Sequence, residues 1–325
     1  MLGCLKAALS ALVGLVSANL HAQSNWLPVH HRYKPVYDAQ AIGNRGLQYQ
    51  SVVVWNEGTN DPDKRGWIVT GQDENGVRLS TDYGATWTNP RLAGMFCSRM
   101  AGLYLNTDDD IFVAVGDAFG NTLAIGGYTG LYVGDSSLLS AKRVEGLVHP
   151  DNSRAFIQVM NGAQAGRNIN CIARRPQTGG LTHAERPIIV IEQERTDLVA
   201  DPISRIFVWL SPDNGATWNM VRELPVADYA TGADGIFQVA VAPNGDVLLM
   251  GQKGAFRSNG TAENPFAGAP TKVYPASGDQ VVSSGYFFGG SPTTSSGARI
   301  GIYQTNPGGV FETADIRNPS FAKPN

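Results

Sequence analysis

Short apolar runs separated by turn residues recur along the chain from about residue 50 to its end. The runs are four to eight residues long and rich in Val, Ile, Phe and Tyr, and Gly, Pro, Asn or Asp lies at their ends. Runs of this length and composition, flanked in this way, are typical of β-strands. Beyond the N-terminal segment, no window of about 12 residues has the spacing of an amphipathic helix. The pattern therefore predicts an all-β fold.

Residues 235–258 show the repeated unit most clearly. A strand is predicted over 235–241, and the dipeptide Asn244-Gly245 then marks a tight turn. A second strand is predicted over 247–250 and a third over 254–258. The unit is a set of three short strands joined by turns.

The same order of strands recurs elsewhere in the chain, as expected for a repeat architecture. The other copies are predicted at 50–56, 66–72 and 77–80; at 100–106, 111–115 and 131–133; at 169–173, 187–192 and 205–210; and at 281–289, 298–304 and 310–313. The third strands end at residues 80, 134, 211, 258 and 313, a spacing close to the period of propeller blades. The apolar run 188–191 fits a strand covered on both faces, as in sheets stacked around an axis.

Two of the third strands run into the same pattern, Ser-x-Asp-x-Gly-x-Thr-Trp, at Ser80–Trp87 and at Ser211–Trp218. Ser and Asp side chains bond the backbone of turns, Gly accepts a positive φ, and an indole can fill the corner of a hairpin. A structural role in a turn is expected for Ser80, Asp82, Gly84 and Trp87, and for Ser211, Asp213, Gly215 and Trp218.

This pattern resembles the Asp-box, or bacterial neuraminidase repeat, family of the sialidase-like superfamily. Shorter copies begin at Gly134, Ser258 and Thr313, so the resemblance covers most of residues 50–320. The family includes sialidases, xyloglucan hydrolases, polysaccharide lyases, sorting receptors and photosystem assembly factors. The resemblance implies a β-propeller of four-stranded antiparallel blades, with the boxes on the face opposite the usual active site. Five blades can be read, and a sixth requires either strands from Trp26–Tyr37 or further C-terminal sequence.

The N-terminus has the pattern of a secretory signal peptide over residues 1–22. Lys6 precedes the apolar run Ala7–Val16, and Ala22 is the small residue before the expected cleavage. Residues 23–325 are then one exported Asp-box propeller domain, secreted or periplasmic. No run reaches the length of about 18 apolar residues that suits a membrane span. We expect a monomer without a membrane span.

The charge balance argues against a nucleic-acid partner, because the formal net charge is −3. Cys97 and Cys171 remain once residues 1–22 are removed, and export would permit a disulfide between them. Aligned blades place the two cysteines several residues out of step, so the sequence leaves their pairing open. No metal site and no cofactor are expected.

Candidate binding residues gather where the first strands of the blades begin. Three consecutive blades offer an arginine there: Arg45, Arg99 and Arg167. Sialidases hold a substrate carboxylate with arginines from several blades, and a guanidinium fork matches a carboxylate with two parallel hydrogen bonds. Candidates for proton transfer or nucleophilic attack at the same end are Asp73, Glu192, Asp234, Asp279 and Tyr49.

Two functions fit these residues. The first is a glycoside hydrolase or polysaccharide lyase acting on acidic glycans. The alternative is a non-catalytic propeller that binds a glycan or a protein at the cell envelope. The Arg-Ile-Pro motif of sialidases is absent and stands scrambled at Arg186-Pro187-Ile188, so the sequence leaves open whether the chain is an enzyme.

Overall fold

The computed structural model is built from β-strands. It describes residues 49–54, 68–72, 76–80, 82–83, 85–86, 96–99, 111–117, 130–135, 142–143, 147, 166–175, 180–195, 202–232, 235–287 and 298–324. The predicted signal peptide and the segment Trp26–Tyr37 lie outside these residues. In the described part of the chain, no helix is long and apolar enough to span a bilayer.

The described residues form five antiparallel sheets that follow one another, and the strands of each sheet are hydrogen-bonded in sequence order. The first two sheets contain β1 (Tyr49–Val54), β2 (Ile68–Gln72) and β3 (Gly76–Ser80), then β4 (Phe96–Arg99), β5 (Ile111–Asp117), β6 (Gly130–Asp135) and β7 (Lys142–Arg143). The third sheet contains β8 (Gly166–Arg174), β9 (Ile188–Arg195), β10 (Ile203–Ser211) and β11 (Asn219–Leu224). Helix α2 (Val226–Tyr229) connects it to β12 (Ile236–Val241), β13 (Val247–Gly251), β14 (Gly254–Asn259) and β15 (Gly268–Tyr274). The fifth sheet contains β16 (Val282–Phe287), β17 (Ile300–Thr305) and β18 (Gly308–Thr313).

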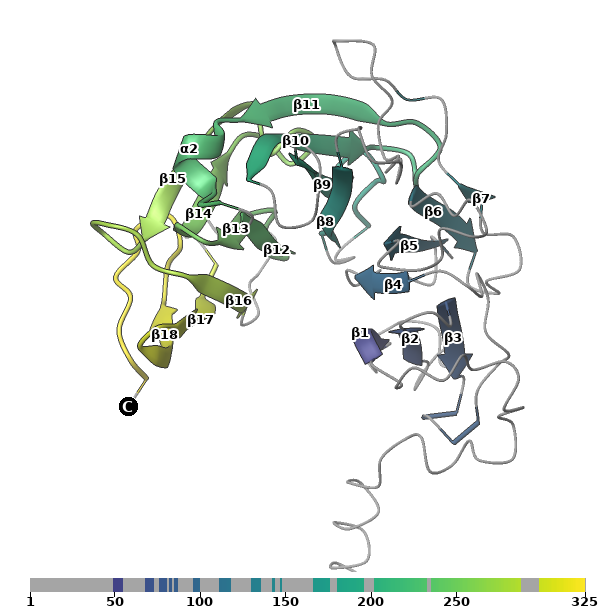
Figure 1. The fold of residues 1–325 in the computed structure, drawn as a ribbon, viewed down its shortest axis with the longest axis horizontal. Helices are drawn as coiled ribbons and strands as arrows, with labels where there is room; N and C mark the ends of the chain where they lie inside the picture. The colour runs from purple at the N-terminus through teal and green to yellow at the C-terminus, as the bar shows by residue number, and fades with distance from the viewer. Residues whose placement is uncertain are drawn as a thin grey trace, which may run out of the picture.

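The sheets are arranged along an arc, with the first strand of each sheet on its inner side (Figure 1). β1 contacts β4, β8 contacts β12, and β12 contacts β16. This is the arrangement of propeller blades, whose inner strands line a common axis. Within the described residues the sheets do not close into a ring.

The sequence placed most strands within a few residues of their positions in the structure. In the second sheet the first described strand is Phe96–Arg99, and the strand predicted over 100–106 lies outside the described residues. The hairpin of the third sheet is longer than predicted, since Gly166 pairs with Arg195. The reason is that the polar residues at its tip still form ladder hydrogen bonds.

Among the described residues, two apolar clusters hold the last three sheets together. One lies between the third and fourth sheets and contains Ile191, Val208 and Phe256. The other lies between the fourth and fifth sheets and contains Met250 and Ile302. Ile188, Ile189, Val190 and Ile191 are each at most 1% exposed, which confirms that this strand is covered on both faces. Burial of apolar side chains on both faces is what stacks the sheets.

One irregularity recurs in all five sheets. The pairing of the first strand with the second shifts by one residue near the start of the first strand, as in a β-bulge. The shift follows Tyr49, Phe96, Ile169, Ile236 and Val282. These residues are therefore structurally equivalent, and they give a common reference level for comparing the sheets.

Candidate functional site

We call the end of the sheets where the first strands begin the mouth face. The second strands also connect to the third strands there. The opposite end carries the turns between third and fourth strands, and we call it the box face. Arg45, Asp73 and Asp234, which the sequence placed on the mouth face, lie outside the described residues. Tyr49 begins β1 and pairs with Gln72, at the reference level of the first sheet.

Arg99 and Arg167 lie on the first strands of neighbouring sheets, but at different levels. Arg167 pairs with Glu194, two residues beyond Glu192, which lies at the reference level of its sheet. In the second sheet, Asp117 lies at the reference level. Arg99 pairs with Val115, which is two residues from Asp117 toward the box face, whereas Arg167 lies on the side of the mouth face. At about 3.3 Å per strand residue, the two positions differ by about 13 Å along the strands. The register therefore places the two arginines at different levels, and their binding of a common ligand stays a prediction.

Glu192 lies inside β9, which extends to Arg195, beyond the strand end predicted at residue 192. Its carboxylate is fully buried, and Trp209 Nε1 donates a hydrogen bond of 2.8 Å to its Oε2. The strand runs on to Arg195 because Gly166, Arg167 and Asn168 pair with its last three residues. The sequence missed Trp209 as a partner. The sequence does contain a signal for such a partner. Glu192 follows the apolar run 188–191, and a carboxylate buried beside such a run needs a hydrogen-bond donor.

Polar residues occupy the reference level of the second strands in four of the five sheets. The residues that pair with the reference residues of the first strands are Gln72, Asp117, Glu192 and Gln304. In the fourth sheet this residue is Gly251. Gln304 is 4% exposed, and its Oε1 accepts a hydrogen bond from the Tyr274 hydroxyl of the fourth sheet. In these four sheets the reference level is therefore a layer of polar residues, set by register, next to the inner strands.

Glutamine side chains next to this layer join neighbouring sheets. Gln193 Nε2 donates to Ile236 O over 3.0 Å, and its Oε1 accepts from Ile236 N over 3.1 Å. Gln238 makes the same pair of hydrogen bonds with the backbone of Gly285, over 3.3 and 3.1 Å. Each amide therefore satisfies a donor and an acceptor of an inner strand in the next sheet.

Asp279 lies on the mouth side of the fourth sheet, in the connection between β15 and β16. Lys272 Nζ is 2.8 Å from its Oδ1, and Lys253 Nζ is 3.8 Å from its Oδ2. The hydrogen bond from Lys272 and the charges of both lysines hold the pKa of Asp279 below its ordinary value, although burial raises it slightly. An exposed carboxylate paired with two ammonium groups is poorly suited to proton transfer near neutral pH.

The turn at Asp82 on the box face is closed by hydrogen bonds to the Asp82 side chain. Thr86 N donates to Asp82 Oδ1 over 2.7 Å, and the Ser80 hydroxyl donates to the same oxygen over 2.8 Å. Tyr83 has a φ of 57°, so the residue before the box glycine adopts the left-handed conformation. Gly84 and Trp87 lie outside the described residues.

The turn at Asp213 has the same geometry. Thr217 N donates to Asp213 Oδ1 over 2.7 Å, and the Ser211 hydroxyl donates to it over 3.0 Å. Gly215 has a φ of 87°, a conformation that glycine adopts without a steric penalty. Trp218 is 6% exposed, and its Nε1 donates to Gly215 O over 3.0 Å. The indole therefore lies across the turn and fills the corner of the hairpin.

Both box carboxyls have a lowered pKa. Burial raises the pKa of each carboxyl, but hydrogen bonds from the threonine four residues later and from the box serine outweigh it. These hydrogen bonds hold the pKa of Asp82 and of Asp213 below the ordinary value of 3.8. Each carboxylate is thus charged and stabilises its turn by accepting hydrogen bonds within it. This explains why the motif places an aspartate at this position.

The described residues contain no group of three or more His, Cys, Asp or Glu side chains arranged to hold a metal ion. Cys171 is 4% exposed within β8, whereas the side chain of Cys97 in β4 lies outside the description. The pairing of the two cysteines therefore stays open.

No protein-family model matches the chain. No curated protein matches its sequence. Among similar solved structures, an ancestral GH74 enzyme has 15% identity and a TM-score of 0.49, and the match covers 86% of this chain and 31% of that one. YCF48 from Cyanidioschyzon merolae has 15% identity and a TM-score of 0.44, with 86% and 73% covered. The alpha-L-arabinanase of Penicillium chrysogenum, complexed with arabinobiose, has 13% identity and a TM-score of 0.48, with 86% of each chain covered. At these identities and scores, the likenesses carry no conclusion about activity.

Proposed function

We propose that the chain is an exported propeller protein of the Asp-box kind that binds an acidic glycan on its mouth face. The observation that carries the proposal is that the inner strands β4 and β8 of two neighbouring sheets carry Arg99 and Arg167. Export rests on the N-terminal pattern of residues 1–22.

Arg99 and Arg167 provide the preference for acidic groups. Because the two positions differ by about 13 Å along the strands, they suit a ligand of several sugar units better than one carboxylate held from two sides. Each guanidinium would then bind its own acidic group by a bidentate pair of hydrogen bonds. The ligand class is therefore an acidic oligosaccharide or polysaccharide.

A glycoside hydrolase or lyase is the second candidate. Asp117 and Glu192 hold equivalent positions on neighbouring sheets, and glycosidases act through a pair of carboxyl groups. Glu192 is already hydrogen-bonded to Trp209, which favours binding over turnover. Recognition of a protein at the cell envelope is the remaining alternative for a non-catalytic propeller.

The test is a binding and turnover screen of the purified protein against a panel of acidic and neutral glycans. Arg167→Ala should weaken binding to the acidic glycans about tenfold or more, because a charge-assisted contact is lost. Arg205→Ala is the matched control, since Arg205 lies on β10 of the same sheet and pairs with Glu223. If no glycan binds or is turned over, the proposal is rejected. Release of reducing or unsaturated sugars would instead support the enzyme.

A further inference from the structure

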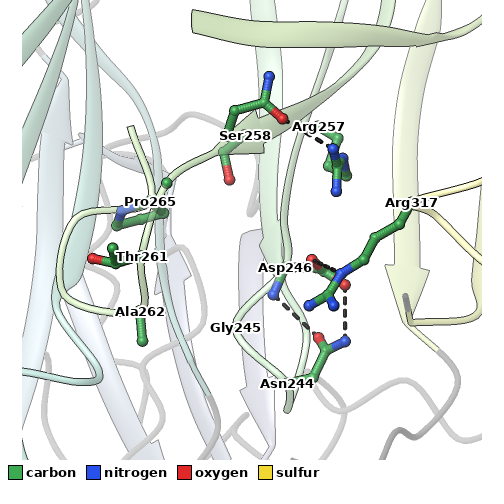
Figure 2. Close-up of a pocket in the computed structure, with 11 residues that line it drawn as sticks. Asn244, Gly245, Asp246, Arg257, Ser258, Thr261, Ala262, Pro265 and Arg317 are labelled. Carbon is green, nitrogen blue, oxygen red and sulfur yellow. Dashed lines mark hydrogen bonds and ion pairs between the residues drawn. The ribbon is translucent and has the colours of Figure 1, made fainter. Parts of the chain in front are cut away.

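A polar cavity of about 490 Å³ opens on the box face, between the fourth and fifth sheets. It is lined by the turn between β12 and β13, by the end of β14 with the loop that follows, and by Arg317 from the segment after β18. Figure 2 shows Arg257 and Arg317 on one side of it, with Thr261, Ala262 and Pro265 across from them. Its volume is within the usual range for small-molecule sites.

Arg317 is fixed at the edge of this cavity by Asp246. Arg317 Nε is 3.1 Å from Asp246 Oδ1, and the other oxygen of that carboxylate accepts from Asn244 Nδ2 over 2.8 Å and from Ala298 N over 3.2 Å. The Asp246 side chain is 9% exposed. Asp246 is therefore engaged by protein donors and holds the two sheets together at the floor of the cavity.

Arg257 carries a positive charge into the cavity that no carboxylate of the described residues neutralises through an ion pair. Its Nη2 donates to Asn259 Oδ1 over 3.0 Å, whereas a guanidinium has five N–H donors. With Arg317 and Asp246, the lining contains two cations and one anion. The cavity is thus electropositive, and it holds unused donors.

The sequence at this corner lacks the carboxylate that the two full boxes carry. In the two full boxes the third residue is an aspartate, Asp82 or Asp213, which supplies an internal carboxylate to the turn. The corresponding residue after Ser258 and Asn259 is Gly260, and the loop is closed by Asn264 N, which donates to Thr261 Oγ1 over 3.1 Å. The fourth sheet therefore has a box corner without its own carboxylate.

We propose that this cavity binds a carboxylate-bearing sugar, with the guanidinium of Arg257 as the partner of the carboxylate. The hydroxyls of Ser258 and Thr261 line the same cavity and are suited to the ring hydroxyls. The site lies on the face opposite the mouth face, so it is distinct from the proposed function and does not depend on it.

A ligand-observed NMR titration of the full chain tests the site with three probes: methyl glucuronide, its neutral parent methyl glucoside, and inorganic sulfate. The glucuronide should bind and the glucoside should bind at least about tenfold more weakly, because only the former can pair with a guanidinium. Arg257→Gln should weaken glucuronide binding by a similar factor. Arg299→Gln should not, since Arg299 pairs with Glu312 on the fifth sheet and does not line the cavity.

Unchanged glucuronide binding in Arg257→Gln, or no glucuronide binding at all, overturns the proposal. Sulfate binding as tight as glucuronide binding overturns the sugar part of it. Thermal unfolding of Arg257→Gln establishes that the variant is folded. Arg167→Ala separates the two faces: glucuronide binding that survives in Arg167→Ala and is lost in Arg257→Gln places the ligand in this cavity. Glucuronide binding that is lost in Arg167→Ala and survives in Arg257→Gln would place the ligand on the mouth face and overturn the proposal.

Discussion

Gly235 lies directly against the side-chain amide of Gln193, and a Cβ on Gly235 would overlap Gln193 Oε1. The amide in turn bonds both backbone groups of Ile236, the residue after that glycine. Gln193 is 1% exposed, so its position is fixed by packing. Because residue 235 has no side chain, Gln193 of the third sheet can reach and hydrogen-bond the backbone of Ile236 in the fourth sheet.

Gly235→Ala should lower the free energy of unfolding by about 2 kcal/mol or more, because it displaces an amide that satisfies two buried backbone groups. Denaturant unfolding measures the effect. Gly309→Ala is the control, since its nearest neighbour, a carbon of Phe311, lies 3.4 Å from the added Cβ, an ordinary contact. Equal stability of the two variants would contradict the role assigned to Gln193.

Replacing Trp209 by Phe should destabilise the protein by about 1–3 kcal/mol, because it leaves the buried carboxylate of Glu192 without its indole donor. The double variant with Glu192→Gln completes a mutant cycle, and we expect a coupling energy of about 1 kcal/mol or more between the two side chains. Additive effects in the cycle would show that the hydrogen bond of 2.8 Å does not stabilise the fold.

Asp213→Asn should cost about 1–2 kcal/mol of stability, since one acceptor of the box carboxylate is lost together with its charge. Asp213 accepts from Ser211 and from both the backbone and the hydroxyl of Thr217. Asp228→Asn in α2 is the matched control, because Asp228 is exposed. Thermal unfolding of both variants compares them, and a larger loss in the control would refute the structural role of the box.

The box carboxylates also predict how stability depends on pH. The folded pKa of Asp213 lies below 3.8, so the carboxyl binds its proton less readily in the folded state. Its stabilisation is complete above its unfolded pKa of about 3.9 and is lost as the pH falls through the lower folded value. Between about pH 5 and pH 3, wild type should lose more stability than Asp213→Asn. Parallel losses in both proteins would show that another group dominates.

The succession of strands could be predicted from the sequence because it depends on local patterns. Val247–Gly251 and Gly254–Asn259 lie almost where the apolar run and the flanking glycine placed them. The turn at Asp213 could be predicted as well, since its donors lie within four residues. These features need no knowledge of distant contacts.

The contacts between sheets could not be predicted, because they join residues far apart in the sequence. Gln193 reaches Ile236 across 43 residues, and Asp246 reaches Arg317 across 71 residues. The level of Arg99 relative to Arg167 depends on strand register, which one residue can change without altering composition.

The one-residue shift in every first strand has a consequence for how these sheets tolerate change. Asn170, Phe237 and Ser283 are the surplus residues in β8, β12 and β16. Deleting any one of them would make the ladder regular, yet it would turn every side chain on one side of the deletion over to the other surface of its sheet. The inner strands should therefore not tolerate a change in length. We expect natural insertions and deletions to accumulate in the connections between strands instead.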